Sequence, residues 1–157
     1  MKTKTIALTI SLVFVSVALG FQNNPNMGTW KLNEAKSKID PATGGKNSTV
    51  TYTEEKGDKI RVTVDGVNQD GKPRHSVWIG KFDGKAYPMR SENMPVDAIA
   101  YKVVNDRTNE INAMKNGKTT WSGTITVSKD GKSRTVDIHG TNENGKKFTS
   151  KAVYDKQ

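Results

Sequence analysis

The chain has 157 residues, a formal net charge of +9 at pH 7, 33% hydrophobic residues and no cysteine. This length is sufficient for one domain with a hydrophobic core and too short for two comfortable ones. The lack of cysteine excludes a disulfide scaffold, a thiolate zinc site, a thiol nucleophile and a lipid-modified N-terminal cysteine.

The first twenty residues have the pattern of a cleaved signal peptide. Two lysines precede a short apolar run, and Ala18 and Gly20 place small residues three and one positions before a cut. The run is shorter than the roughly 20 apolar residues that a membrane-spanning helix needs. The sequence therefore predicts a signal peptide over 1–20, a flexible N-terminal segment over 21–27 and one folded domain over 28–157.

From residue 28 onward the pattern is one of short strands joined by turns. Trp30 and Leu32 share one face of the first strand, because residues two apart in a strand point to the same side. Later strands show the same alternation, and Asp83-Gly84 and Asn116-Gly117 are typical of β-hairpin turns. Strands are predicted over 28–32, 48–54, 59–64, 74–82, 85–89, 98–104, 108–115, 118–127, 133–140 and 147–154.

The spacing of the turns decides the predicted architecture. Turn signals recur about every ten to twelve residues, and no long helical pattern is present. A β-sandwich is the alternative, but Greek-key sandwiches need longer crossovers than these tight turns provide. An open sheet would leave two edges that invite aggregation. We therefore predict an all-β fold, a single antiparallel up-and-down β-barrel of about eight to ten strands.

The basic charge does not point to nucleic acid. The lysines lie mostly in turns, which fall at both ends of an up-and-down barrel, and no arginine cluster interleaves with aromatic residues to form a stacking platform. We expect a monomer with a solvated basic surface and no nucleic-acid partner. Weak contact with anionic envelope polymers is left open.

Both ends of the chain resemble known barrels. The stretch 28–32, Gly-Thr-Trp-Lys-Leu, resembles the opening strand of the calycins, the lipocalins and fatty-acid-binding proteins. The stretches 81–85 and 153–156 are similar to the fatty-acid-binding group in particular. The whole mature chain resembles small secreted bacterial proteins with a lipocalin-like barrel. The resemblance implies such a barrel over 28–157, with a cavity for a small apolar ligand.

Two departures from the fatty-acid-binding group bear on the ligand. Only 33–48 is available for the helical lid which that group inserts after its first strand. The Tyr of the group's carboxylate-holding Arg-x-Tyr pair is matched by Tyr154, but the Arg position is Ala152. The resemblance therefore does not supply a cation for a ligand carboxylate.

Large aromatic residues on the predicted inward faces either line a cavity or fill it. The same strand alternation places four polar residues on the inward faces, namely Tyr52, Ser76, Ser150 and Tyr154. Their side chains offer hydroxyls and no cation. Burying a carboxylate without a partner costs several kcal/mol, so a neutral apolar ligand is predicted. The candidate cavity-lining residues are Trp30, Tyr52, Trp78, Tyr101, Trp121, Phe148 and Tyr154.

The sequence shows no catalytic or metal-binding constellation. His75 and His139 are the only histidines, and strand alternation predicts that both face outward. We expect no enzyme activity, no metal and no cofactor; haem ligation by one histidine is left open. The predicted function is a secreted or periplasmic binding protein for a small apolar molecule. The alternative is an envelope-associated structural or adhesion protein with a filled core, acting through its basic surface.

Overall fold

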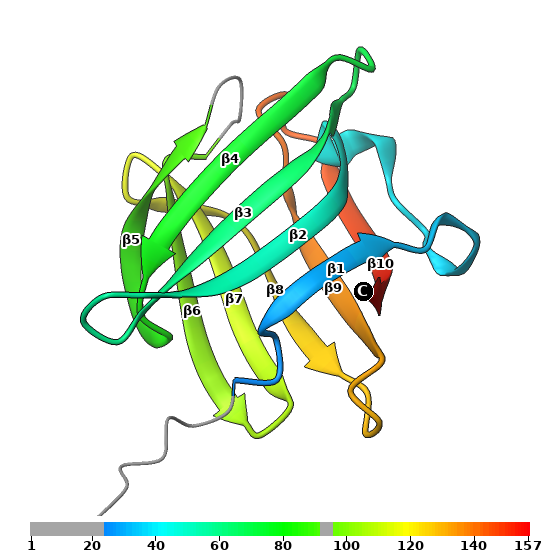
Figure 1. Cartoon of the computed structure of the whole chain (residues 1–157). Coiled ribbons are helices and arrows are strands. Elements are labelled where there is room, and N and C mark those ends of the chain that lie inside the picture. The colour runs from blue at the N-terminus through cyan, green and yellow to red at the C-terminus, as the bar shows by residue number, and fades with distance from the viewer. Residues whose placement is uncertain (1–23, 92–95) are drawn as a thin grey trace, which may run out of the picture.

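The computed structural model describes residues 24–91 and 96–157, so the predicted signal peptide lies outside the described residues. Within them the chain forms ten antiparallel strands and two short 3-10 helices (Figure 1). No helix in the described ranges is both long and apolar enough to span a membrane. The strands are β1 (Gly28–Leu32), β2 (Gly45–Glu55), β3 (Lys59–Asn68), β4 (Pro73–Gly80), β5 (Asp83–Ser91), β6 (Ala98–Asn105), β7 (Thr108–Lys115), β8 (Lys118–Val127), β9 (Ser133–Thr141) and β10 (Lys147–Lys156).

The sheet is a closed barrel. Each strand pairs with the next in sequence, and β1 pairs with both β2 and β10. The predicted antiparallel up-and-down barrel is therefore confirmed. Because the sheet closes on itself, these ten strands leave no sheet edge for another chain to extend.

The short β1 is continued along β10 by an irregular segment. This segment contains η1 (Glu34–Lys36) and η2 (Pro41–Thr43). It is held to β10 by a β-bridge between Lys38 and Lys151 and by hydrogen bonds of the Ser37 and Ser150 hydroxyls. The side chain of Asn33 accepts a hydrogen bond from the Lys36 amide at 3.2 Å and so caps η1. The segment covers the gap that β1 is too short to fill.

The connection between β4 and β5 differs from the prediction. The sequence predicts Asp83-Gly84 as a two-residue turn after a strand ending at residue 82. Instead β4 ends at Gly80, and Asp83-Gly84 belongs to β5. β5 pairs with β6 from Asp83 onward, opposite Lys102, with a register shift between Asp83 and Ala86, so both residues of the predicted turn lie within the strand.

Residues 24–27, just before β1, form a hydrogen-bonded turn, and the rest of the segment predicted to be flexible, 21–23, lies outside the described residues. Asn26 is 0% exposed, and its carbonyl accepts a hydrogen bond from Trp30 Nε1 at 2.7 Å. The Asn24 side chain accepts from the Asn26 amide at 3.0 Å, and the Met27 amide donates to the Asn24 carbonyl. These bonds fold 24–27 into a turn at the barrel end.

Candidate functional site

The barrel interior holds a buried arginine. Arg134 on β9 is 2% exposed, and its Cζ lies 5.0 Å from the ring of Trp30 and 4.9 Å from the rings of Tyr52 and Tyr154. The three aromatic faces stabilise the cation electrostatically. Its Nη1 contacts Asn26 Oδ1 at 3.4 Å, while its buried Nε has no hydrogen-bond partner among the described residues.

A second guanidinium enters the interior from β4. Arg74 Nη2 donates to Asn47 Oδ1, and Arg74 Nε is buried without a hydrogen-bond partner in the described part of the chain. Burial lowers the pKa of Arg74 from its ordinary value. The expectation that no cation faces inward is therefore wrong. Arg134 is in phase with Val136, and Arg74 with Ser76, so strand alternation itself places both arginines on the inward face.

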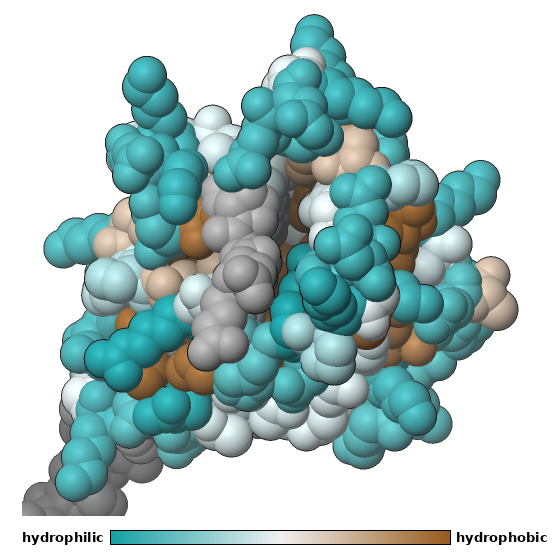
Figure 2. Space-filling view, turned by 90° about the horizontal axis from the view of Figure 1, so that it is seen from above, coloured by the Kyte–Doolittle hydropathy of each residue, from teal (hydrophilic) through white to brown (hydrophobic). Residues whose placement is uncertain are grey.

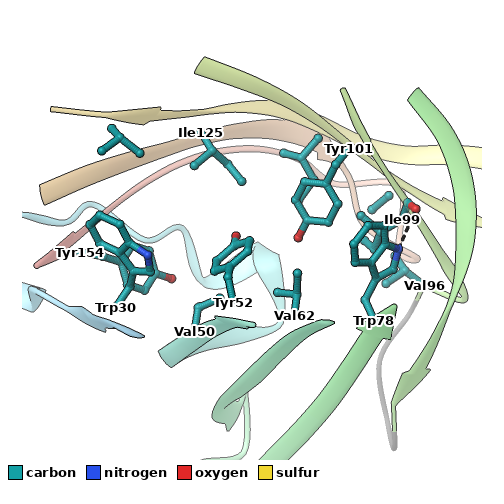
Figure 3. Packing of buried hydrophobic residues seen from close by; sticks show 13 residues of the cluster. Trp30, Val50, Tyr52, Val62, Trp78, Val96, Ile99, Tyr101, Ile125 and Tyr154 are labelled. Atoms are coloured by element: carbon teal, nitrogen blue, oxygen red, sulfur yellow. Dashed lines mark hydrogen bonds between the residues drawn. The ribbon is translucent and has the colours of Figure 1, made fainter. Parts of the chain in front are cut away.

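Three tyrosines line the same interior (Figure 3). Burial raises the pKa of Tyr101 well above its ordinary value, and the neighbouring Tyr52 raises it further. Burial likewise raises the pKa of Tyr154 to about 12. Tyr154 Oη donates to the Asn47 carbonyl at 3.2 Å. The interior thus offers phenols and guanidiniums, but no carboxylate forms an ion pair with either arginine among the described residues.

Alkaline pH should destabilise the fold through Tyr154. A phenol with a raised pKa in the folded state contributes stability that is present below pH 10 and is lost as pH rises to about 12. The contribution is up to about 3 kcal/mol. Urea unfolding at increasing pH should show a steeper loss for the wild type than for Tyr154→Phe, which lacks the titrating group. Parallel pH profiles would contradict this assignment.

A cluster of aromatic rings surrounds Phe82 in the interior. Phe82 stacks on Tyr101 with ring centroids 4.6 Å apart and planes at 6°. It also makes edge contacts with Trp78 at 6.0 Å and Tyr52 at 6.5 Å. Trp78 Nε1 donates to the Ile99 carbonyl at 2.9 Å, which fixes the cluster to β6.

A cavity of about 1030 Å³ opens at one end of the barrel. We call it the end cleft. It lies among the β2–β3, β4–β5 and β6–β7 connections and the segment before β1. These connections are at the lower end of the barrel in Figure 1. Charged side chains from the same three connections surround it. Its apolar lining comprises Pro25, Met27, Ile60, Phe82 and Val103.

The opposite end of the barrel also has a polar rim. Figure 2 looks down on it and shows hydrophilic side chains around the rim with apolar residues recessed between them. A smaller groove of about 480 Å³ runs there between η1, η2 and the β3–β4 turn. It contains an ion pair between Lys46 and Glu34 at 2.7 Å, so part of its charge is already neutralised.

The predicted cavity residues lie in the interior and not in the end cleft. Trp121 is half-buried, near a register shift between Ala113 and Met114. Val103, predicted in phase with Tyr101, is 47% exposed and lines the end cleft instead. The buried members of the predicted set are Trp30, Tyr52, Trp78, Tyr101, Phe148 and Tyr154.

Strand alternation does not reveal the end cleft as a whole, because the cleft combines strand ends with their connections and with the segment before β1. Alternation identifies faces of strands, whereas Met27 precedes β1 and Phe82 follows β4. The signal present in the sequence is Phe82 itself, a large aromatic residue directly before a turn dipeptide.

Both histidines are exposed, as the strand alternation predicts. His75 Nδ1 lies 2.7 Å from Asp65 Oδ1 on the outer surface. No cluster of three or more potential metal ligands occurs within residues 24–91 and 96–157.

No protein-family model matches the chain, and no curated protein matches its sequence significantly. Two solved structures are similar in shape. One, described as EF1p2_mFAP2b bound to DFHBI, is 14% identical with a TM-score of 0.45, over 85% of this chain and 94% of the other. The second, a redesigned beta barrel, mFAP1, bound to DFHBI, is 16% identical with a TM-score of 0.42, over 84% and 95%. The barrel assignment of this chain rests on its own strand pairing.

Proposed function

We propose that the protein is a non-catalytic binding protein for a small, largely apolar molecule. The observation that carries the proposal is the end cleft, a cavity of about 1030 Å³ with Met27, Ile60 and Phe82 in its lining and a charged rim. Binding sites for small molecules typically have volumes of about 300–1,000 Å³, apolar walls and a few polar groups.

Two neighbouring valines provide a matched test. Val103 lines the end cleft and is 47% exposed, whereas Val104 is 51% exposed and is not among the residues that line it. Val103→Glu should weaken binding of an apolar fluorescent dye at least tenfold, because a charge then enters the apolar wall. Val104→Glu should leave the affinity unchanged. Equal affinities of the two variants would place the dye elsewhere.

Native mass spectrometry of the protein purified without denaturation tests the same proposal independently. A bound small molecule that is lost in Val103→Glu would support it. A protein that retains no small molecule and binds no dye would contradict it, and would favour the alternative of a filled barrel acting through its basic surface.

The interior cations change the expected ligand chemistry. The expected neutral ligand followed from an interior without cations, but Arg134 and Arg74 each keep a buried Nε without a hydrogen-bond partner among the described residues. Neither arginine lines the end cleft, so a ligand would have to extend from the cleft into the interior for its anionic or strongly accepting group to supply charge-assisted hydrogen bonds. We therefore propose an apolar molecule that carries such a group.

This proposal predicts the order of two affinities. In a displacement titration at pH 7, a long-chain fatty acid should bind about tenfold tighter than its methyl ester, a difference of about 1.4 kcal/mol. The ester has the same chain but no charge, so it serves as the matched control. Tighter binding of the ester would contradict this proposal and would support the neutral apolar ligand predicted from the sequence.

We further propose that the protein is exported with removal of residues 1–20. The basic start, the apolar run and the small residues before the cut support this, as does the resemblance to small secreted bacterial barrels. Sequencing the N-terminus of the exported protein should return Phe21 or a residue within a few positions of it. Recovery of Met1 would contradict processing.

A further inference from the structure

We infer that ligands reach the barrel interior through the end cleft and that the ring of Phe82 is the gate between the two. The inference rests on the proposed function, since it concerns access to the same site. Its starting point is that one side chain lines the end cleft and also packs against the buried core of the barrel. Phe82 lines the end cleft, and the same ring contacts Tyr52, Trp78 and Tyr101 in the interior.

The ring of Phe82 is the boundary of the interior at this end. Its stacking partner Tyr101 is buried, and so is Tyr52, whose ring lies against Arg134. A molecule in the end cleft that displaced the Phe82 ring would therefore meet the face of Tyr101 and then the phenol of Tyr52. Beyond them lies the guanidinium whose Nε has no partner among the described residues.

The backbone of Phe82 lies outside the hydrogen-bonded ladder between β4 and β5. Lys81 and Phe82 lie between β4 and β5 and belong to neither strand. Near the end cleft the two strands do not pair; their ladder joins Ser76, Val77 and Trp78 to residues 89–91, further along the barrel.

On the other side of β5, the pairing with β6 shifts between Asp83 and Ala86. Moving Phe82 outward therefore breaks ring contacts but no hydrogen bonds of the β4–β5 ladder. Segments with few ladder bonds open most readily.

The lack of cysteine allows the entry route to be tested at single sites. Asp106→Cys places a thiol in the lining of the end cleft, and Asn144→Cys places one in the β9–β10 turn at the opposite end. Both positions are exposed. Each variant is modified with a bulky polymer maleimide, and the association rate constant of an apolar fluorescent dye is measured by stopped flow.

Modification at Asp106→Cys should slow dye association at least tenfold, while modification at Asn144→Cys should leave it unchanged. A slowed rate for modified Asn144→Cys, or equal rates for both, would overturn the inference. The unmodified protein separates the two proposals. If it binds no dye the proposed function fails, whereas dye binding with rates insensitive to the label at Asp106→Cys removes only the entry route.

The gate has its own test. Phe82→Ala should raise both the association and the dissociation rate constants of the dye at least fivefold, because the barrier has been removed for both directions. Phe82→Tyr keeps the ring and should retain wild-type rates. Unchanged rates in a folded Phe82→Ala protein would show that the ring is no gate. If Phe82→Ala does not fold, the labelling experiment still decides the route.

Discussion

Replacing Trp30 with alanine is expected to lower the free energy of unfolding by about 3–5 kcal/mol. The side chain is 0% exposed, so its removal leaves a cavity that the closed barrel cannot collapse easily. The Asn26 carbonyl would also lose its hydrogen-bond donor, because Trp30 Nε1 donates to it at 2.7 Å in the wild type. Arg134 would lose one of the three aromatic rings that surround its charge.

Urea unfolding followed by circular dichroism measures this change. Trp30→Phe is the matched control, since it retains a ring but not the indole N–H, and it should cost less than the alanine variant. A loss below about 1 kcal/mol for Trp30→Ala would place the ring outside the core and contradict the structure.

Replacing Gly123 with alanine is expected to destabilise the barrel by about 3 kcal/mol, at the upper end of overpacking effects. A Cβ added to Gly123 would lie 2.1 Å from the Asp137 carbonyl oxygen and 2.7 Å from Ile138 Cγ2. The nearest atom is backbone of the neighbouring strand, so β8 and β9 would have to separate locally. The same unfolding measurement reports the loss.

Gly71→Ala is the matched control for Gly123→Ala, because it tests the cost of an unfavourable backbone conformation without steric crowding. Gly71 has φ +75°, and an added methyl group there would meet no atom within 4 Å beyond its chain neighbours, so only the left-handed conformation is penalised. Its cost should be about 1 kcal/mol. Equal losses at Gly71 and Gly123 would show that the β8–β9 contact yields to the added methyl group.

The strand faces could be predicted from the sequence because every second residue of a strand in an antiparallel barrel points into the buried interior. Trp30, Tyr52 and Trp78 are buried as the period of two requires. The same rule, applied to β9 without regard to charge, places Arg134 inside. Its burial is unexpected from composition because arginine is rarely buried without a partner. Tyr154 lies opposite it on β10, whereas the rings of Trp30 and Tyr52 come from distant parts of the chain.

The end cleft could not be predicted in the same way. Its walls come from three connections, the strand ends beside them and the segment before β1, and the relative placement of these parts depends on the closure of the whole barrel. Alternation in the predicted strand 74–82 puts Phe82 on the same face as Trp78, but no local period in the sequence places Met27 in the wall. A prediction from alternation therefore describes the inside of the barrel better than its end.

The pairing of the first strand with the last sets the order in which this protein can fold. Trp30 lies opposite Lys156, and the Gln157 amide donates to the Thr29 carbonyl at 3.0 Å. Neighbouring hairpins can form locally, but this seam joins distant parts of the chain and carries the largest loop-closure entropy. Such non-local pairing slows folding to about milliseconds to seconds. Until the seam forms, β1 and β10 expose unpaired edges, so the unclosed intermediate is the species most prone to associate with other chains.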